Sequence, residues 1–192
     1  MATIIPRREW RTFGAQFGEA EDKIKAYGEV AFKKSSENYI LSRNSNENCK
    51  IRDDLMDIKS PLQVNEDKLE QWYPTMKEGF PLSKEAIVKL FTEFFKIEVP
   101  ELEEAYDYAA FVELCKQQKD LCVVDVYKER HIFNIDETTV EIADTKFNGV
   151  PNRTICVEHI DPALVMSVVR KLSLEGLPNI NYINAMKQAV GL

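Results

Sequence analysis

The chain has 192 residues, of which 44 % are hydrophobic and 30 % are charged, enough apolar material for the core of one large globular domain. Its 25 Lys and Arg residues against 32 Asp and Glu residues give a net charge of −7, which argues against a protein that coats nucleic acid. No stretch approaches the roughly 18 uninterrupted apolar residues of a membrane span. We expect a single domain over residues 1–192, with neither a membrane nor double-stranded nucleic acid as its partner.

The first half of the chain predicts short strands joined by polar turns, with one helix after the first strand. Alternating apolar and polar residues indicate the strands, and polar clusters such as residues 44–48 indicate the turns. Apolar residues at helical spacing indicate the helix. The predicted strands cover residues 4–13, 38–43, 49–52, 55–62 and 68–76, and the predicted helix covers residues 15–27.

The second half of the chain predicts helices, then strands, then helices again. Ser83 is an N-cap candidate for the first of these helices, which must end before Pro100. Asp161 and Pro162 are typical of a helix start, as N-cap and first helical residue. The other predicted helices cover residues 106–116, 162–172 and 182–190, and the predicted strands cover residues 121–135, 138–147 and 153–160.

Strands and helices therefore arrive in blocks, which predicts an α+β fold with a mainly antiparallel sheet. No Gly/Ser-rich linker separates the two strand-rich blocks, so they could form two halves of one barrel around a shared interior. The four cysteines form no CxxC pair, which indicates free thiols and not a zinc site. The N-terminus lacks the apolar core of a secretory signal, and we expect a cytoplasmic protein.

Several predicted strands put two basic side chains on one face, because side chains at positions i and i+2 point to the same side of a sheet. Cations on a sheet face cost free energy unless an anion meets them, so their recurrence in an acidic chain predicts a site for a chain of phosphates. The alternative is that these charged faces lie against water. The predicted phosphate-binding residues are Arg7, Arg11, Lys50, Arg52, Lys59, Lys128 and Arg130.

Carboxylates lie in or at the ends of the predicted strands, and their oxygens could hold Mg²⁺ or Mn²⁺ that bridges phosphate oxygens. The alternative is a set of intramolecular salt bridges with no metal. The chain has no glycine-rich phosphate loop, so side chains would have to bind the phosphates. The predicted metal ligands are Glu9, Glu70, Glu141, Asp144 and Glu158.

The order of these motifs resembles the CYTH superfamily, the triphosphate tunnel metalloenzymes, over nearly the whole chain. Basic and acidic strand motifs of that family have counterparts here in the same order. Residues 49–59 and 69–74 are also similar to a bacterial CYTH-like subgroup labelled exopolyphosphatase-associated. The stretches that match the family are residues 7–11, 50–52 with Lys59, 128–130, 139–142 and 154–158.

The resemblance implies a closed antiparallel β-tunnel with flanking helices, whose lumen holds a metal-bound triphosphate or polyphosphate. It also implies hydrolysis of a phosphoanhydride, with Mg²⁺ or Mn²⁺ as the cofactor and basic side chains that stabilise the phosphate charge. On this resemblance, the predicted catalytic residues are Glu9, Glu158 and Lys59.

Two departures from the family pattern keep other functions open. Arg7 replaces the first Glu of the opening motif, and the spacing of Glu141 and Asp144 puts these two side chains on opposite faces of a regular strand. The first hypothesis is a hydrolase of inorganic triphosphate, short polyphosphate or an organic triphosphate, for which a homodimer is possible. The second is a non-catalytic polyphosphate- or nucleotide-binding module. The third is an interaction protein whose charged strands are merely paired.

Overall fold

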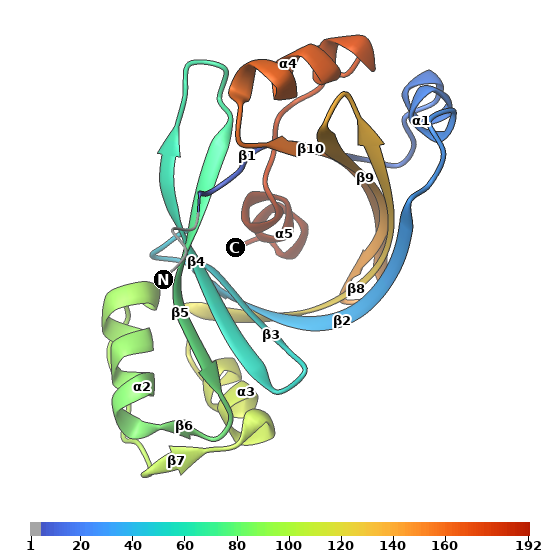
Figure 1. Cartoon of the computed structure of the whole chain (residues 1–192). Coiled ribbons are helices and arrows are strands. Elements are labelled where there is room, and N and C mark those ends of the chain that lie inside the picture. Colours follow the sequence, from blue (N-terminus) through green and yellow to red (C-terminus); the bar gives the residue numbers. More distant parts are fainter. Residues whose placement is uncertain (1–4) are drawn as a thin grey trace.

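An eight-stranded antiparallel sheet that closes on itself dominates the computed structural model, which describes residues 5–192 (Figure 1). The closure joins β1 to β5, where Glu9 lies opposite Glu70. This arrangement confirms the predicted α+β fold with a closed antiparallel barrel. In ring order the strands are β1 (Arg8–Gly14), β10 (Val150–His159), β9 (Thr138–Phe147), β8 (Leu121–Ile135), β2 (Ala31–Ser42), β3 (Asn48–Arg52), β4 (Leu55–Val64) and β5 (Glu70–Gly79).

The helices occupy three places relative to this barrel (Figure 1). Two helices cover its outer face at one side, a helical lobe with a small two-stranded sheet packs at another, and α5 (Tyr182–Val190) lies inside the ring of strands. The remaining elements are α1 (Glu19–Lys25), β6 (Leu82–Ser83), α2 (Lys84–Lys89), the π-helix η1 (Leu90–Phe95), β7 (Ala105–Tyr106), α3 (Tyr108–Lys116) and α4 (Pro162–Lys171).

The main differences from the sequence-based prediction lie near the N-terminus. The sequence does not predict residues 31–37 as strand because they are polar, yet they pair with β8 from Ala31 to Glu37. The helix predicted over residues 15–27 is shorter, since Gly18 with a φ of 51° precedes its first residue. The first strand begins at Arg8, and Ile4 lies outside the described residues. The single-domain organisation stays a prediction.

The outer face of the barrel is apolar where α1 and α4 cover it. Trp10, Ile155 and Val157 of the sheet are buried and pack in one cluster with Val165 and Val168 of α4. Because strand side chains alternate, burial of these residues turns their sequence neighbours to the inside of the barrel. The outer packing therefore fixes which residues can line the lumen.

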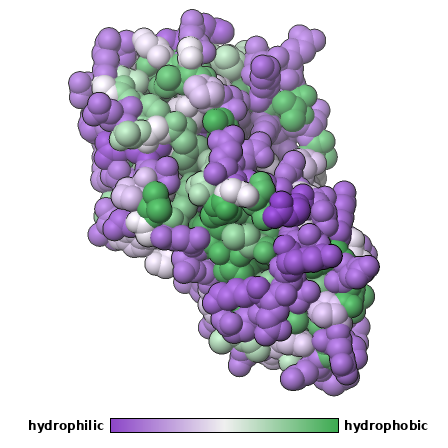
Figure 2. Space-filling model, turned by 180° about the vertical axis from the view of Figure 1, so that it is seen from behind, coloured by the Kyte–Doolittle hydropathy of each residue, from purple (hydrophilic) through white to green (hydrophobic). Residues whose placement is uncertain are grey.

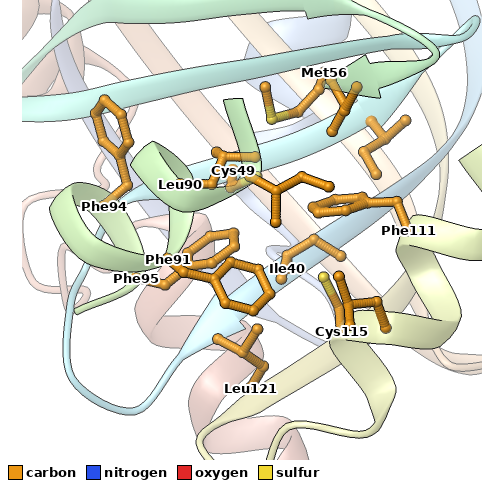
Figure 3. Close-up of a cluster of buried hydrophobic side chains, with 14 of the residues drawn as sticks. Ile40, Cys49, Met56, Leu90, Phe91, Phe94, Phe95, Phe111, Cys115 and Leu121 are labelled. Atoms are coloured by element: carbon orange, nitrogen blue, oxygen red, sulfur yellow. The ribbon is translucent and has the colours of Figure 1, made fainter. Parts of the chain in front are cut away.

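A second apolar core joins the sheet to the helical lobe (Figure 3). Ile40, Cys49 and Met56 point outward from the sheet and meet Phe91 of η1 and Phe111 of α3, and all five are buried. Ile51 and Ile58 belong to the same cluster, so their neighbours Lys50, Arg52 and Lys59 face the other way. This core thus positions the basic side chains of β3 and β4.

The surface seen in Figure 2 is mostly hydrophilic, with hydrophobic side chains gathered near the middle of that face. The helical lobe, at the lower left in Figure 1, projects at the lower right in this reversed view. Within residues 5–192, no helix is both long and apolar enough to cross a membrane.

Helix α5 fills one end of the barrel interior. Tyr39, Val126 and Phe147 point inward from three strands and form a buried cluster with Tyr182 and Ile183 of α5. Helix α5 buries the apolar side chains of this part of the inner face, which would otherwise be exposed to water in the lumen. The charged residues of the inner face lie further along the same strands.

We predict that Ile183→Ala destabilises the fold by about 2–5 kcal/mol, because it removes a side chain that is 1 % exposed and leaves a cavity inside the barrel. Gln188→Ala, on the exposed side of the same helix, is the control and should change stability by less than about 0.5 kcal/mol. Urea unfolding of both variants measures the difference. Equal unfolding midpoints would show that α5 contributes nothing to the barrel core.

Candidate functional site

The strand pleat brings nearly all of the predicted site residues to the inner face of the barrel. Outward partners such as Trp10 and Ile51 lie in the two outer cores, and the residues between them point inward. Arg7 precedes β1 and reaches Glu158 on β10. The predicted residues that face the lumen from the strands are Glu9, Arg11, Lys50, Arg52, Lys59, Glu70, Lys128, Arg130, Glu141 and Glu158.

Asp144 is the exception among the predicted site residues. It lies on the outer face of β9, where Arg153 donates from Nε to Oδ1 at 2.8 Å and from Nη2 to Oδ2 at 2.9 Å. The same arginine also donates to Glu21 of α1 at 2.8 Å. The structure therefore does not bring Asp144 to the other predicted metal ligands, because it and Glu141 point to opposite faces of the strand.

A cleft of about 630 Å³ opens beside the inner ends of β2, β3 and β8. Five of its eight lining residues are Lys or Arg, and the one carboxylate among them is Asp53. The cleft lies further along β2 from the part of that strand that contacts α5, so it opens away from the helix. Its lining residues are Lys33, Lys34, Ser35, Ser36, Lys50, Arg52, Asp53 and Arg130.

Two of the cleft cations lack full neutralisation by the protein. Within residues 5–192 the buried Nε of Arg130 has no hydrogen-bond partner, and its Nη1 lies 3.8 Å from Glu141. Lys50 Nζ lies 3.9 Å from Asp57, and burial together with the nearby charges of Lys59 and Arg52 lowers the pKa of Lys50 despite the carboxylates around it. Crowded cations of this kind are stabilised when an anion binds between them.

A buried ion pair forms the floor of the cleft. Lys128 Nζ donates to Glu37 Oε2 at 2.9 Å and to the hydroxyl of Tyr39 at 2.8 Å, and Arg52 reaches Glu37 at 3.4 Å. Burial alone would raise the pKa of Glu37, but the charges of Lys128 and Lys50 outweigh it and lower the pKa to about 2. Burial lowers the pKa of Lys128 to about 8. Because Lys128 is buried and is not among the lining residues, it lies beneath the cleft.

The opposite wall of the lumen carries carboxylates that are already paired with arginines. Arg11 is buried and lies 2.8 Å from Glu9 and 3.4 Å from Glu141. Arg7 donates to Glu158 at 2.8 Å. Burial, and then the adjacent charge of Glu9 on the neighbouring strand, raise the pKa of Glu158 although Arg7 opposes this. The carboxylates of this wall are thus largely neutralised by the two arginines.

The predicted Mg²⁺ or Mn²⁺ site does not assemble from these carboxylates as they are placed. Glu70, Glu9 and Glu158 lie in one row across β5, β1 and β10. However, Glu70 accepts from Asn181 at 2.9 Å and from Trp72 at 3.1 Å, and the other two bind arginines. Within residues 5–192, no group of three or more His, Cys, Asp or Glu side chains is arranged to hold a metal ion. The donor set does not fit the expected cofactor.

Sequence reasoning missed three residues that shape the site, namely Glu37, Tyr39 and Tyr182. Glu37 lies in the polar stretch that the sequence does not predict as strand, although the alternation through Lys33, Ser35 and Glu37 is a weak signal for one. The guanidinium of Arg11 lies 4.5 Å from the ring centroid of Tyr182, and Lys128 Nζ lies 4.2 Å from it. A short helix at the end of the chain gives no sign that it enters a barrel.

No family model matches the chain, and no curated protein matches it in sequence. Solved structures do match it in fold. One is HpAC1 of Hippeastrum, a candidate adenylyl cyclase by name that is described as having a dominant triphosphatase activity, at 9 % identity and a TM-score of 0.53 over 95 % of this chain and 96 % of that one. Another is a conserved hypothetical protein of Pyrococcus furiosus, at 13 % identity and a TM-score of 0.53 over 92 % and 98 % of the two chains.

A third match is a protein of Bacillus halodurans named as an adenylate cyclase, at 12 % identity and a TM-score of 0.50 over 95 % of this chain and 98 % of that one. Identities this low show the shared fold alone. Together with the closed eight-stranded ring, they establish that the chain has a CYTH-like tunnel fold.

We predict that Glu37→Gln lowers the free energy of unfolding by about 3 kcal/mol, because it leaves the buried ammonium of Lys128 without a counter-charge. Glu129→Gln, which removes a carboxylate from the outer face of β8, is the matched control. Its partner Lys34 is exposed, so the loss should stay below about 1 kcal/mol. Denaturant unfolding at neutral pH compares the two, and similar losses would contradict the central place of Glu37.

Proposed function

We propose that the protein binds a triphosphate-containing small molecule or a short polyphosphate in the basic cleft and acts on it. The observation that carries the proposal is the composition of the cleft, whose lining has five cations and one carboxylate. Two of these cations already have partners outside the lining, since Lys34 pairs with Glu129 and Arg52 with Glu37. A phosphate chain supplies several negative charges within a few ångströms of one another, so it matches a cluster of cations better than a singly charged ligand does.

The side chains of the cleft suit phosphate oxygens in different ways. Arg52 and Arg130 present planar guanidinium groups that can pair with two oxygens each, whereas Lys50 and Lys33 act as mobile point charges. The unpaired Nε of Arg130 offers a buried donor that needs an acceptor. Lys59, half-buried on β4 next to this group, would act on the same ligand. Lys128 would contribute its charge from beneath.

Hydrolysis of a phosphoanhydride is the action that we propose, and the state of Glu158 favours it. Burial, and then the neighbouring charge of Glu9, raise the pKa of Glu158, and a raised pKa is typical of carboxyl groups that act as general acids. The triphosphatase activity described for the Hippeastrum protein supports the same reaction class through the shared fold. A binding module without turnover is the alternative, which Arg7 in place of a family Glu favours.

The subgroup, the cofactor, the cellular location and the oligomeric state of the protein are inferred from its sequence. The motifs in residues 49–59 and 69–74 support membership of the exopolyphosphatase-associated subgroup. Mg²⁺ or Mn²⁺ as a cofactor, a cytoplasmic location and a homodimer stay predictions. Because the carboxylates do not fit a metal site as they are paired, no step of the proposed reaction is assigned to a metal ion.

We predict that Arg52→Ala removes most of the thermal stabilisation that tripolyphosphate gives to the wild-type protein. At a ligand concentration about 100 times Kd, binding adds about 2.7 kcal/mol to stability, which raises Tm by several degrees. Arg52 is half-exposed and Glu37 keeps Lys128, so the fold should survive the substitution. Lys116→Ala on α3, an exposed residue of the helical lobe that does not line the cleft, is the charge-matched control. An unchanged shift in the Arg52 variant would place the ligand elsewhere.

We predict that the purified protein releases phosphate from tripolyphosphate or ATP, and that Glu158→Gln reduces the rate by about 100-fold, as loss of a general acid or base does. Release is measured with Mg²⁺, with Mn²⁺ and with EDTA, so that the assay also tests the predicted cofactor. Glu78→Gln on β5, which is exposed and does not line the cleft, is the control for loss of a strand carboxylate. Binding without release under all three conditions would identify the non-catalytic module.

A further inference from the structure

On the acidic wall of the lumen, an arginine binds one oxygen of each of Glu9, Glu141 and Glu158. The guanidinium of Arg11 lies between Glu9 and Glu141, at 2.8 and 3.4 Å, and Arg7 lies 2.8 Å from Glu158. A divalent cation bound by carboxylates needs their oxygens at about 2.1 Å in a closed arrangement. A metal ion that used the paired oxygens would have to displace both guanidinium groups, and one that used the remaining oxygens would lie beside two fixed positive charges.

Displacement of Arg11 is costly because this side chain is buried. Its exposed fraction is 6 %, and the Tyr182 ring, 4.5 Å from the guanidinium carbon, packs against it. Arginine stays protonated at any ordinary pH, so the charge cannot be removed by loss of a proton. A divalent ion at Glu9 would therefore lie beside the fixed positive charge of Arg11, whose other carboxylate partner is Glu141.

The cleft on the other side of the lumen already has the charge that a metal would bring to the ligand. It is lined by Lys33, Lys34, Lys50, Arg52 and Arg130, and the Nε of Arg130 has no hydrogen-bond partner among the residues that the structure describes. A divalent ion carried in by the ligand would cancel part of the negative charge that these side chains attract. The bare anion thus has more favourable contacts with the cleft than its metal complex has.

We propose that the site binds its phosphate chain as the free anion, without a divalent cation, and that Arg7 and Arg11 provide the fixed positive charge on the acidic wall. This inference rests on the proposed function, since it concerns the form in which the same ligand binds. Arg7 and Arg11 are positioning residues here, which keep Glu9, Glu141 and Glu158 from repelling the anion.

The test is isothermal titration calorimetry of the full chain with tripolyphosphate in EDTA, in excess Mg²⁺ and in excess Mn²⁺. We expect Kd in EDTA to be equal to or lower than Kd with either metal. Binding that requires Mg²⁺ or Mn²⁺ would overturn the inference and leave the proposed function standing. An absence of binding under all three conditions would overturn the proposed function itself.

Two adjacent arginines give a matched pair of variants for the same titration. Arg7→Ala removes the partner of Glu158, and Arg7 is exposed, so the fold should not change. We expect its Kd in EDTA to rise about tenfold, because an unpaired carboxylate then faces the anion, and we expect added Mg²⁺ to restore part of the affinity.

Arg8→Ala removes the same charge from the other face of the strand, where Arg8 donates to the carbonyl of Leu69 at 3.4 Å. Its Kd should match that of the wild type under all three conditions. Equal Kd values for the Arg7 and Arg8 variants in EDTA would show that Arg7 does not replace a metal charge.

Discussion

The structure depends on how a closed sheet neutralises the charges that it turns inward, and the buried pair of Glu37 and Lys128 is the central case. Outer apolar cores hold many of the alternate residues of the strands, so the charged residues between them have no route to bulk water on that side. Glu37 is ionised at neutral pH because Lys128 and Lys50 outweigh the cost of burying it. Glu37 and Lys128 are stable in this position only as a pair, because loss of either one would leave the other as an unpaired buried charge.

This pair also separates two parts of the lumen with different chemistry. On one side Tyr39 and Tyr182 continue from it into the apolar contact with α5, and the ring of Tyr182 lies near both Lys128 and Arg11. On the other side the strands end in the basic cleft. The helix therefore does more than fill space, because it supplies the aromatic surface on which the two buried cations rest.

Much of the site could be predicted from the sequence, because a period of two determines the face of each strand residue. That period places Lys50 with Arg52, and it separates Glu141 from Asp144, as the structure has them. The place of Glu37 could not be predicted, since its partner lies 91 residues away and the surrounding residues are polar. Nor could the pairing of Arg7 with Glu158, which depends on strands at opposite ends of the chain. The alternation of a strand predicts the face on which each residue lies, whereas only the closed ring determines which residues of different strands become neighbours.

The net charge of −7 and the basic cleft are compatible because the excess acid lies elsewhere on the chain. Glu101, Glu103 and Glu104 are exposed in the segment before β7, outside the barrel interior. Within the lumen, arginines neutralise the carboxylates of one wall. These carboxylates therefore do not cancel the positive electrostatic potential of the cleft cations. A cleft with low-dielectric walls concentrates that field on an anion that enters it. The cleft of about 630 Å³ therefore favours a short, densely charged ligand.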